Sequence, residues 1–344
     1  MADKQGSTSG LVWKTLIPVA IGVAVVVGMM MREFTLDQFR TIPWTPVSIV
    51  GILLAVVAMT GREFGLMWRW RVLTDSGLTW RQSFRVTMMQ EFTSAITPTT
   101  AGGSALSMVF LHREGLSLGR STSITLVTLM LDELFVVVAC PLIFLLIPGG
   151  EIFGFAEDKL AAGLRVSFWI VYGGVCLITV LLYIGAFVAP HRIAAGLTRL
   201  FGLRWLRRWQ PKVREMGQNL TEAGRDLRHR PWRWWAQAFS ATVMTWVSRY
   251  LVVNALFFGF APTAPQTIVF ARQFIVWTLL TVSPTPGGSG ISEWLFATYY
   301  GDLLPVASMA LVIAVIWRLI SYYVYLIFGV FALPSWLRRP KSRS

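Results

Sequence analysis

Charged residues are scarce in this sequence of 344 residues. Asp, Glu, Lys and Arg together make up 14% of the chain, against about 25% in an average soluble domain. Hydrophobic residues make up 55%, and the mean hydropathy is +0.59. These values exclude an ordinary soluble globular protein, because most of the side chains must face either lipid or a buried interior.

Residues that bind metals or perform covalent chemistry are also few. The two cysteines, Cys140 and Cys176, fall in apolar stretches, so we interpret them as packing residues rather than as a disulfide. The three histidines, His112, His191 and His229, do not form a ligand cluster. The sequence also lacks motifs for a nucleophile, a nucleotide or a zinc ion. We therefore expect no cofactor and no enzymatic activity.

Positive charge is in clear excess, with a formal net charge of +14. In a soluble protein this excess would favour a nucleic acid partner, but here no basic globular domain is left to bind one. The basic residues gather instead in 62–85, 190–233 and the tail 338–343, which are predicted to be cytoplasmic. The more acidic segment 148–164 is predicted to lie outside. The spacing of apolar residues in 190–233 predicts an amphipathic helix on the cytoplasmic surface, either a connector or a site for lipid or a partner.

Six apolar stretches are long enough to cross the hydrocarbon core, which takes about 20 helical residues. The first of them, 11–31, has no convincing signal-peptidase site after it, so we expect it to be retained as an anchor helix. The predicted spans are 11–31, 46–68, 120–147, 165–189, 234–258 and 305–333.

Two further apolar regions, 82–111 and 266–300, are interrupted by proline and glycine at 97–104 and 283–290. Proline removes a backbone donor and glycine disfavours helix, so each region is predicted to form two half-helices. The loop charges are satisfied if each region returns to the side that it entered, the first from the cytoplasm and the second from outside. Two ordinary kinked helices are the alternative.

The sequence thus predicts an all-α polytopic membrane protein of six full spans and two re-entrant hairpins of opposite orientation. Such a pair of interrupted segments is typical of an inverted repeat around a site at the membrane midplane. The two halves would be 46–147 and 234–333. Both chain termini would be cytoplasmic, in the inner cell membrane.

Ionisable residues within apolar segments are costly, so each is a candidate functional residue. Buried ion pairs are expected, for example of Glu133 or Glu293 with Arg249 or Arg318, and such pairs could also serve only to fix helix register. The candidates are Arg62, Glu63, Glu91, Asp132, Glu133, Arg249, Arg272, Glu293 and Arg318.

Helices are predicted to restart after each break, at about Ser104 and Ser289. A helix N-terminus offers unpaired N–H groups and a positive dipole, which suits an anion such as phosphate, and glycine lets the backbone approach it. Glu293 could instead cap the second restart or select a headgroup amine. The glycines concerned are Gly102, Gly103, Gly287 and Gly288.

The chain resembles the lysylphosphatidylglycerol synthase transmembrane (flippase-type) family in three places, over about 46–333. The most specific motif is Pro284-Thr285-Pro286-Gly287-Gly288-Ser289-Gly290-Ile291-Ser292-Glu293, followed by Trp317-Arg318-Leu319-Ile320-Ser321-Tyr322. The looser ones are Thr97-Pro98 to Gly102-Gly103 with Leu111-His112-Arg113-Glu114-Gly115, and Leu131-Asp132-Glu133-Leu134.

The resemblance implies a lipid-translocating fold with two inverted halves. It also places the site around the two glycine pairs, Glu133, Glu293 and Arg318. Tyr322, four residues after Arg318 in the same motif, is a further candidate binding residue. The family often has Glu-Arg where this chain has Asp132-Glu133, and this difference changes the local charge. The soluble aminoacyltransferase domain of bifunctional members is missing, so we expect no synthesis of aminoacylated lipid.

We therefore predict translocation of an anionic phospholipid or related lipid between leaflets. Arg249, Arg272 and Arg318 would bind its phosphate, and Glu133 and Glu293 would tune charge or carry a coupled proton. A proton- or ion-coupled transporter of a small polar solute is the main alternative. An enzyme acting on lipid-linked sugar and a structural partner protein are weaker ones. The expected partner is membrane lipid and not nucleic acid, with a homo-oligomer or a separate lipid-modifying enzyme left open.

Overall fold

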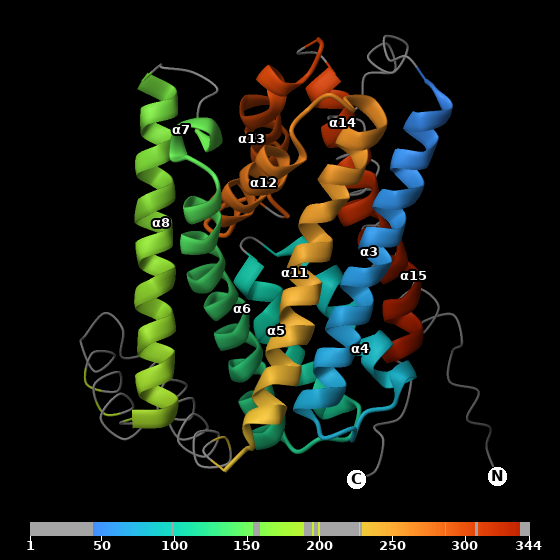
Figure 1. The fold of residues 1–344 in the computed structure, drawn as a ribbon. Helices are drawn as coiled ribbons and strands as arrows, with labels where there is room; N and C mark the ends of the chain where they lie inside the picture. Colours follow the sequence, from blue (N-terminus) through green and yellow to red (C-terminus); the bar gives the residue numbers. More distant parts are fainter. Residues whose placement is uncertain are drawn as a thin grey trace, which may run out of the picture.

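The regular structure of the described residues is helical throughout (Figure 1). In this computed structural model, five helices are long and apolar enough to cross a membrane: Pro46–Leu73, Leu118–Leu146, Leu160–Tyr183, Trp232–Phe260 and Met309–Gly329. The chain is therefore a polytopic helical membrane protein. The described residues are 44–97, 100–153, 159–188, 195, 199, 227, 229–285, 287–306 and 309–337.

The five long helices correspond to five of the six predicted spans. The predicted anchor 11–31 lies outside the described residues, as do most of the basic segment 190–233 and the tail from 338. The helices are α3 (Pro46–Leu73), α6 (Leu118–Leu146), α8 (Lys159–Tyr183) continued by the π-helix η1 (Ile184–Val188), α11 (Trp232–Phe260), and α14 (Met309–Arg318) continued through the π-helix η4 (Leu319–Tyr323) into α15 (Val324–Leu337).

Local signals begin several of these helices. The hydroxyl of Thr45 accepts the N–H of Ser48 at 3.2 Å, and Pro46 occupies the first turn of α3. Ser117 caps α6 in the same way through the N–H of Arg120. At its other end α3 continues to Leu73, five residues past the predicted boundary, because Arg69 and Trp70 are buried there rather than forming a loop.

The two interrupted regions each form two helices. The first comprises α4 (Trp80–Ile96) and α5 (Thr100–Arg113), and the second comprises α12 (Gln266–Leu280) and α13 (Ile291–Tyr300). In Figure 1 the first pair occupies the lower half of the molecule and the second pair the upper half. Short helices α7 (Gly149–Ile152) and η3 (Gly301–Leu303) lie in the connections.

The first break is shorter than predicted. The chain leaves α4 at Thr97 and is helical again from Thr100, so Gly102, Gly103 and Ser104 belong to α5 and not to the break. Glycine in a helix costs only about 1 kcal/mol. Packing of α5 against α4 and α6 therefore suffices to keep the two glycines helical.

The second break is longer at its end than predicted. Helix α13 begins at Ile291 rather than at about Ser289, after three glycines with positive φ: Gly287, Gly288 and Gly290, at 56°, 74° and 80°. Residues with a side chain rarely adopt this backbone conformation. The glycine-rich motif thus specifies a turn that other residues would strain.

Helices α3 and α11 pack side by side along their length (Figure 1). Small residues allow this approach: a Cβ on Gly51 would lie 2.6 Å from the Gly259 Cα, and one on Gly65 would lie 2.6 Å from Thr245 Oγ1. The Ser48 hydroxyl also donates to the Gly259 carbonyl at 3.2 Å. This close contact holds the polar side chains of the two helices at fixed positions relative to each other.

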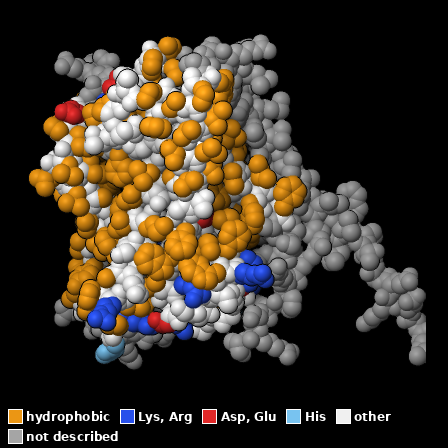
Figure 2. All heavy atoms as spheres, turned by 45° about the vertical axis from the view of Figure 1, so that its right-hand side comes forward, with side chains coloured by type: hydrophobic (Ala, Val, Ile, Leu, Met, Phe, Trp, Pro, Cys, Tyr) orange, Lys and Arg blue, Asp and Glu red, His pale blue; other side chains and the backbone are white. Residues whose placement is uncertain are grey.

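The outer surface is suited to lipid. Figure 2 shows hydrophobic side chains over most of one face, with Lys and Arg side chains gathered in its lower part. Among the described residues, exposed basic side chains occur at helix starts of this lower end, for example Arg81 at the start of α4 and Arg233 at the start of α11. Charge is therefore unequal between the two ends of the helices.

Candidate functional site

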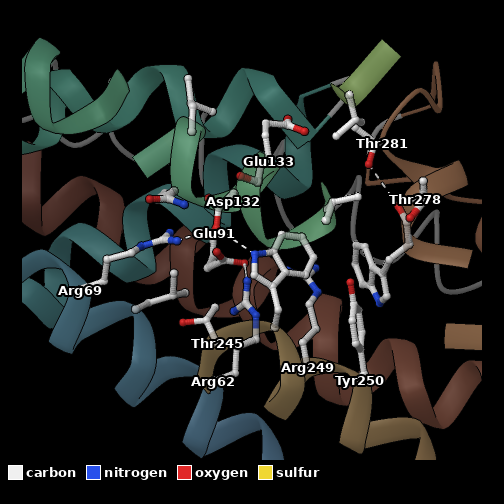
Figure 3. Close-up of a pocket in the computed structure, with 18 residues that line it drawn as sticks. Arg62, Arg69, Glu91, Asp132, Glu133, Thr245, Arg249, Tyr250, Thr278 and Thr281 are labelled. Atoms are coloured by element: carbon white, nitrogen blue, oxygen red, sulfur yellow. Dashed lines mark hydrogen bonds and ion pairs between the residues drawn. The ribbon is translucent and has the colours of Figure 1, made fainter. Parts of the chain in front are cut away.

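A cavity of about 130 Å³ lies among α3, α4, α6, α8, α11 and α12. Charged, hydroxyl and aromatic side chains line it, which is unusual for the interior of an apolar helix assembly. Figure 3 shows arginines of α3 and α11 directed toward the acidic residues of α4 and α6. The charged lining residues are Arg62, Arg69, Glu91, Asp132, Glu133 and Arg249.

The cavity lies at the middle of the long helices. Asp132 is 14 residues from both Leu118 and Leu146, the ends of α6, and Trp246 is 14 residues from both ends of α11. The two central residues touch, because the indole Nε1 of Trp246 donates to Asp132 Oδ1 at 2.8 Å. At 1.5 Å rise per residue, each helix end is about 21 Å away. The charged cavity therefore lies at the middle of α6 and α11.

Arg62 on α3 is paired with two carboxylates. Its Nη2 lies 2.7 Å from Glu91 Oε2 on α4, and its Nη1 contacts the neighbouring Glu63. The Tyr325 hydroxyl of α15 donates to Glu63 Oε1 at 2.5 Å and accepts from Arg62 at 3.2 Å. Arg62 is 2% exposed, so this pairing replaces the water that the guanidinium loses on burial.

Arg69 forms a second closed pair about two turns further along α3. Its Nη1 lies 2.5 Å from Asp132 Oδ1, the oxygen that also accepts the Trp246 indole. The same nitrogen is 3.4 Å from the Thr242 hydroxyl of α11. Asp132 thereby joins α3, α6 and α11 around the cavity.

Arg249 and Glu133 differ from these pairs. The guanidinium carbon of Arg249 lies 3.6 Å from the Trp277 ring centroid and 5.7 Å from that of Trp246. Within the described part of the chain, neither Arg249 nor Glu133 forms an ion pair or a side-chain hydrogen bond, and Arg249 Nε is buried without a partner. In Figure 3 the two side chains reach the cavity from opposite sides, Glu133 from α6 and Arg249 from α11.

A separate cluster of polar residues surrounds the second break. Arg318 donates to the Gly287 carbonyl and to Ser289 Oγ, each at 2.6 Å, and its Nε lies 2.7 Å from Glu293 Oε1. Glu293 Oε2 accepts the N–H of Gly290 at 2.7 Å, so it caps α13, one of its two predicted roles. The predicted Glu293–Arg318 ion pair is confirmed.

Tyr322 completes this cluster. Its ring lies under the Arg318 guanidinium at 3.8 Å, and its hydroxyl donates to the Ala95 carbonyl at 3.0 Å. A Cβ on Gly287 would come within 2.0 Å of the ring, so glycine is required there. Tyr322 thus links the second break to the end of α4, the helix that enters the first break.

The family of the chain is shown by comparison with known proteins. A family model described as the lysylphosphatidylglycerol synthase TM region matches residues 15–329. The chain belongs to this family. Within it, the chain is similar to a UPF0104 membrane protein of Archaeoglobus fulgidus, with 25% identity over 325 residues, covering 90% of this chain and 94% of that protein. No solved structure gave a significant match.

The predicted site residues of this family member do not gather around one cavity. Glu133 and Arg249 line the central cavity, whereas Gly287, Gly288, Ser289, Glu293, Arg318 and Tyr322 surround the second break. Gly102, Gly103 and Ser104 lie in the first two turns of α5. The sequence thus predicted one site where the structure has two separate polar regions, the central cavity and the second break.

Arg272 does not line the cavity. It forms a bidentate pair with Asp302, at 2.5 and 2.9 Å, and donates to the Tyr299 and Glu151 carbonyls. Tyr299 lies in the last turn of α13, Asp302 in η3 directly after it, and Glu151 in α7. Arg272 therefore stabilises the packing of α12 against α13 and α7. The sequence did not predict this pairing, because Asp302 lies just after the predicted hairpin 266–300.

Several lining residues were not predicted. Arg69 was counted among loop charges because α3 was expected to end at 68, and nothing in the sequence indicated that Trp246 and Trp277 line the cavity. The available signal in the sequence was that Arg69-Trp70 directly continues the apolar run 46–68 with no proline or glycine to end the helix. Among the described residues, no group of three or more His, Cys, Asp or Glu side chains is placed to hold a metal ion.

Proposed function

We propose that this protein moves phospholipids between the two leaflets, with the headgroup passing through the central cavity while the acyl chains stay in the bilayer. The observation that carries the proposal is the Arg249 guanidinium, which borders a polar cavity at the middle of the long helices without a carboxylate partner among the described residues. Guanidinium groups suit phosphate, the group that all phospholipid headgroups share.

The size of the cavity and its surroundings support this role. A volume of about 130 Å³ holds a small polar group and not an acyl chain. Exposed apolar side chains on the surrounding helices, such as Leu53, Val57, Ile170 and Leu177, leave the surface suited to lipid tails. The family description names a lipid synthase region, which supports a lipid substrate.

We also propose the predicted topology. The pairs α4–α5 and α12–α13 would be re-entrant hairpins of opposite orientation, in an inverted repeat around the cavity. Their positions in opposite halves of Figure 1 support this arrangement. Both chain termini would face the cytoplasm of an inner cell membrane, because basic side chains gather at the lower end of the molecule.

The test is a scrambling assay with purified protein in liposomes. The vesicles carry phospholipids with a fluorophore on one acyl chain, and dithionite is added outside. We expect quenching beyond the outer-leaflet fraction, and a rate about 10 to 100 times lower for Arg249→Gln, which loses a charge-assisted contact. Arg81→Gln removes an exposed positive charge and serves as the matched control.

The competing function is transport of a small polar solute coupled to protons or ions. The small cavity volume favours it as a second candidate. Wild-type vesicles that quench no further than protein-free ones, while carrying a proton flux that Arg249→Gln abolishes, would replace the lipid proposal with this one.

A further inference from the structure

Two of the charged side chains that line the cavity, one basic and one acidic, form no ion pair among the described residues. Arg62 is paired with Glu91 at 2.7 Å and also contacts Glu63, and Arg69 is paired with Asp132 at 2.5 Å. Both pairs connect different helices and so belong to the framework of the cavity. Arg249 and Glu133 remain, one of each sign, and each borders the same cavity.

Neither of these two residues is neutralised by its neighbours. The Arg249 guanidinium contacts aromatic faces, Trp277 at 3.6 Å and Trp246 at 5.7 Å, and these contribute less than a carboxylate would. Glu133 follows Asp132 in α6, and residues adjacent in a helix point in different directions. Asp132 therefore takes the Arg69 partner and leaves the Glu133 carboxylate without an ion pair in the described structure.

A charge without a partner in a poorly hydrated interior is costly, so a suitable ligand compensates both residues at once. A headgroup that carries only a phosphate would satisfy Arg249 but would be repelled by Glu133. A cation would satisfy Glu133 and be repelled by Arg249. A headgroup with one phosphate and one ammonium carries an opposite charge for each of these two side chains.

We propose that the substrate is a zwitterionic phospholipid whose headgroup joins a phosphate to a primary ammonium, with phosphate at Arg249 and ammonium at Glu133. This inference rests on the proposed function and narrows its substrate from phospholipids in general to zwitterionic ones. It differs from the sequence-based prediction, which was a lipid with net negative charge. Glu133 is then a specificity residue, and its loss changes which lipid moves rather than whether any lipid moves.

The experiment compares three probes with identical acyl chains and fluorophore in the same liposomes. They are phosphatidylethanolamine, its N-acetyl derivative, which keeps the phosphate but loses the positive charge, and phosphatidylglycerol. For the wild-type protein we expect phosphatidylethanolamine to move at least about ten times faster than the other two. Glu133→Gln should bring the three rates within about twofold of one another, whereas Glu151→Gln, at an exposed position, should keep the preference.

Each outcome decides something. Equal rates for the three probes in the wild-type protein would overturn the zwitterion proposal and leave translocation itself standing. A preference that persists in Glu133→Gln would assign the ammonium to another group and overturn the role of Glu133. No movement of any probe would reject both proposals. The comparison among probes needs only the wild-type protein, so a variant that failed to fold would not prevent the decision.

Discussion

Arg249 and Arg318 both lie within apolar helices, but their guanidinium groups are used differently. Arg318 has a partner for each side of its guanidinium: the Gly287 carbonyl, Ser289 Oγ and the Glu293 carboxylate. Arg249 has aromatic faces and an open cavity, and no carboxylate among the described residues pairs with it. A basic residue inside a membrane helix can therefore be structural or available, and its partners distinguish the two.

The comparison extends to the regions around the two arginines. At the second break, a carboxylate, a hydroxyl, a carbonyl and the Tyr322 ring are all bound to one guanidinium. In the cavity, two closed ion pairs frame two charges that are left open. We infer that the first region fixes a backbone turn, whereas the second can accept a ligand. Substitutions in the first region should therefore lower stability, whereas substitutions in the second should lower transport.

The largest expected effect on stability is at Arg318. Arg318→Ala removes three polar contacts and leaves the largely buried Glu293 carboxylate, 12% exposed, without its counter-charge, so the free energy of unfolding should fall by about 3–5 kcal/mol. Arg249→Gln should change it by less than about 1 kcal/mol, because the lost cation–π contacts are offset by removal of an uncompensated charge. Thermal unfolding of the detergent-purified variants, followed by tryptophan fluorescence, measures both.

The same measurement tests whether Arg249 is a structural residue like Arg318. If Arg249→Gln destabilises the protein as strongly as Arg318→Ala, then Arg249 is a structural residue and the cavity is not a site. Arg81→Ala, at an exposed position on α4, controls for the loss of a positive charge alone and should leave the unfolding free energy unchanged within about 0.5 kcal/mol.

Much of the fold could be predicted from two patterns in the sequence. Apolar length predicted the five described spans, and proline–glycine interruptions predicted that 82–111 and 266–300 each form two helices. The end of α3 was predicted wrongly because Arg69 and Arg71 resemble loop charges. In the structure one is buried on Asp132 and the other donates to the Leu78 carbonyl at 2.6 Å.

The site was less predictable because its geometry depends on contacts between distant residues. Arg69 and Asp132 are 63 positions apart, and no local pattern says which acid compensates which arginine. The glycine motif did predict the turn at Gly287 and the capping by Glu293, since both depend on neighbouring residues. Local backbone chemistry is thus readable from sequence, whereas the division between closed pairs and open charges required the fold.

A smaller effect is expected at Gly287. Gly287→Ala places a Cβ within 2.0 Å of the Tyr322 ring at a φ of +56°, so it should cost about 2–3 kcal/mol of unfolding free energy. Gly173→Ala is the matched control: nothing lies within 4 Å of its Cβ on α8, and alanine in a helix should stabilise by about 0.5–1 kcal/mol. If Gly287→Ala were as stable as wild type, the conclusion that the second break fixes a rigid backbone turn would be wrong.

The smallest expected effect is at the contact between the two regions. The Tyr322 hydroxyl donates to Ala95, whose carbonyl belongs to the last turn of α4 and has no partner within the helix. Tyr322→Phe keeps the ring beneath Arg318 and should lower the unfolding free energy by about 1 kcal/mol, whereas Tyr183→Phe, exposed on α8, should lower it by much less.

Transport by Tyr322→Phe gives the more informative reading, because α4 also carries Glu91 at the cavity. If the two regions are independent, the scrambling rate per folded molecule stays at the wild-type value. A rate that falls about tenfold while the protein remains folded would mean that the second break controls the position of α4 and hence of the Arg62–Glu91 pair. Arg318 would then act on transport through Tyr322, and the separation of a structural from an available arginine would have to be replaced by one coupled unit.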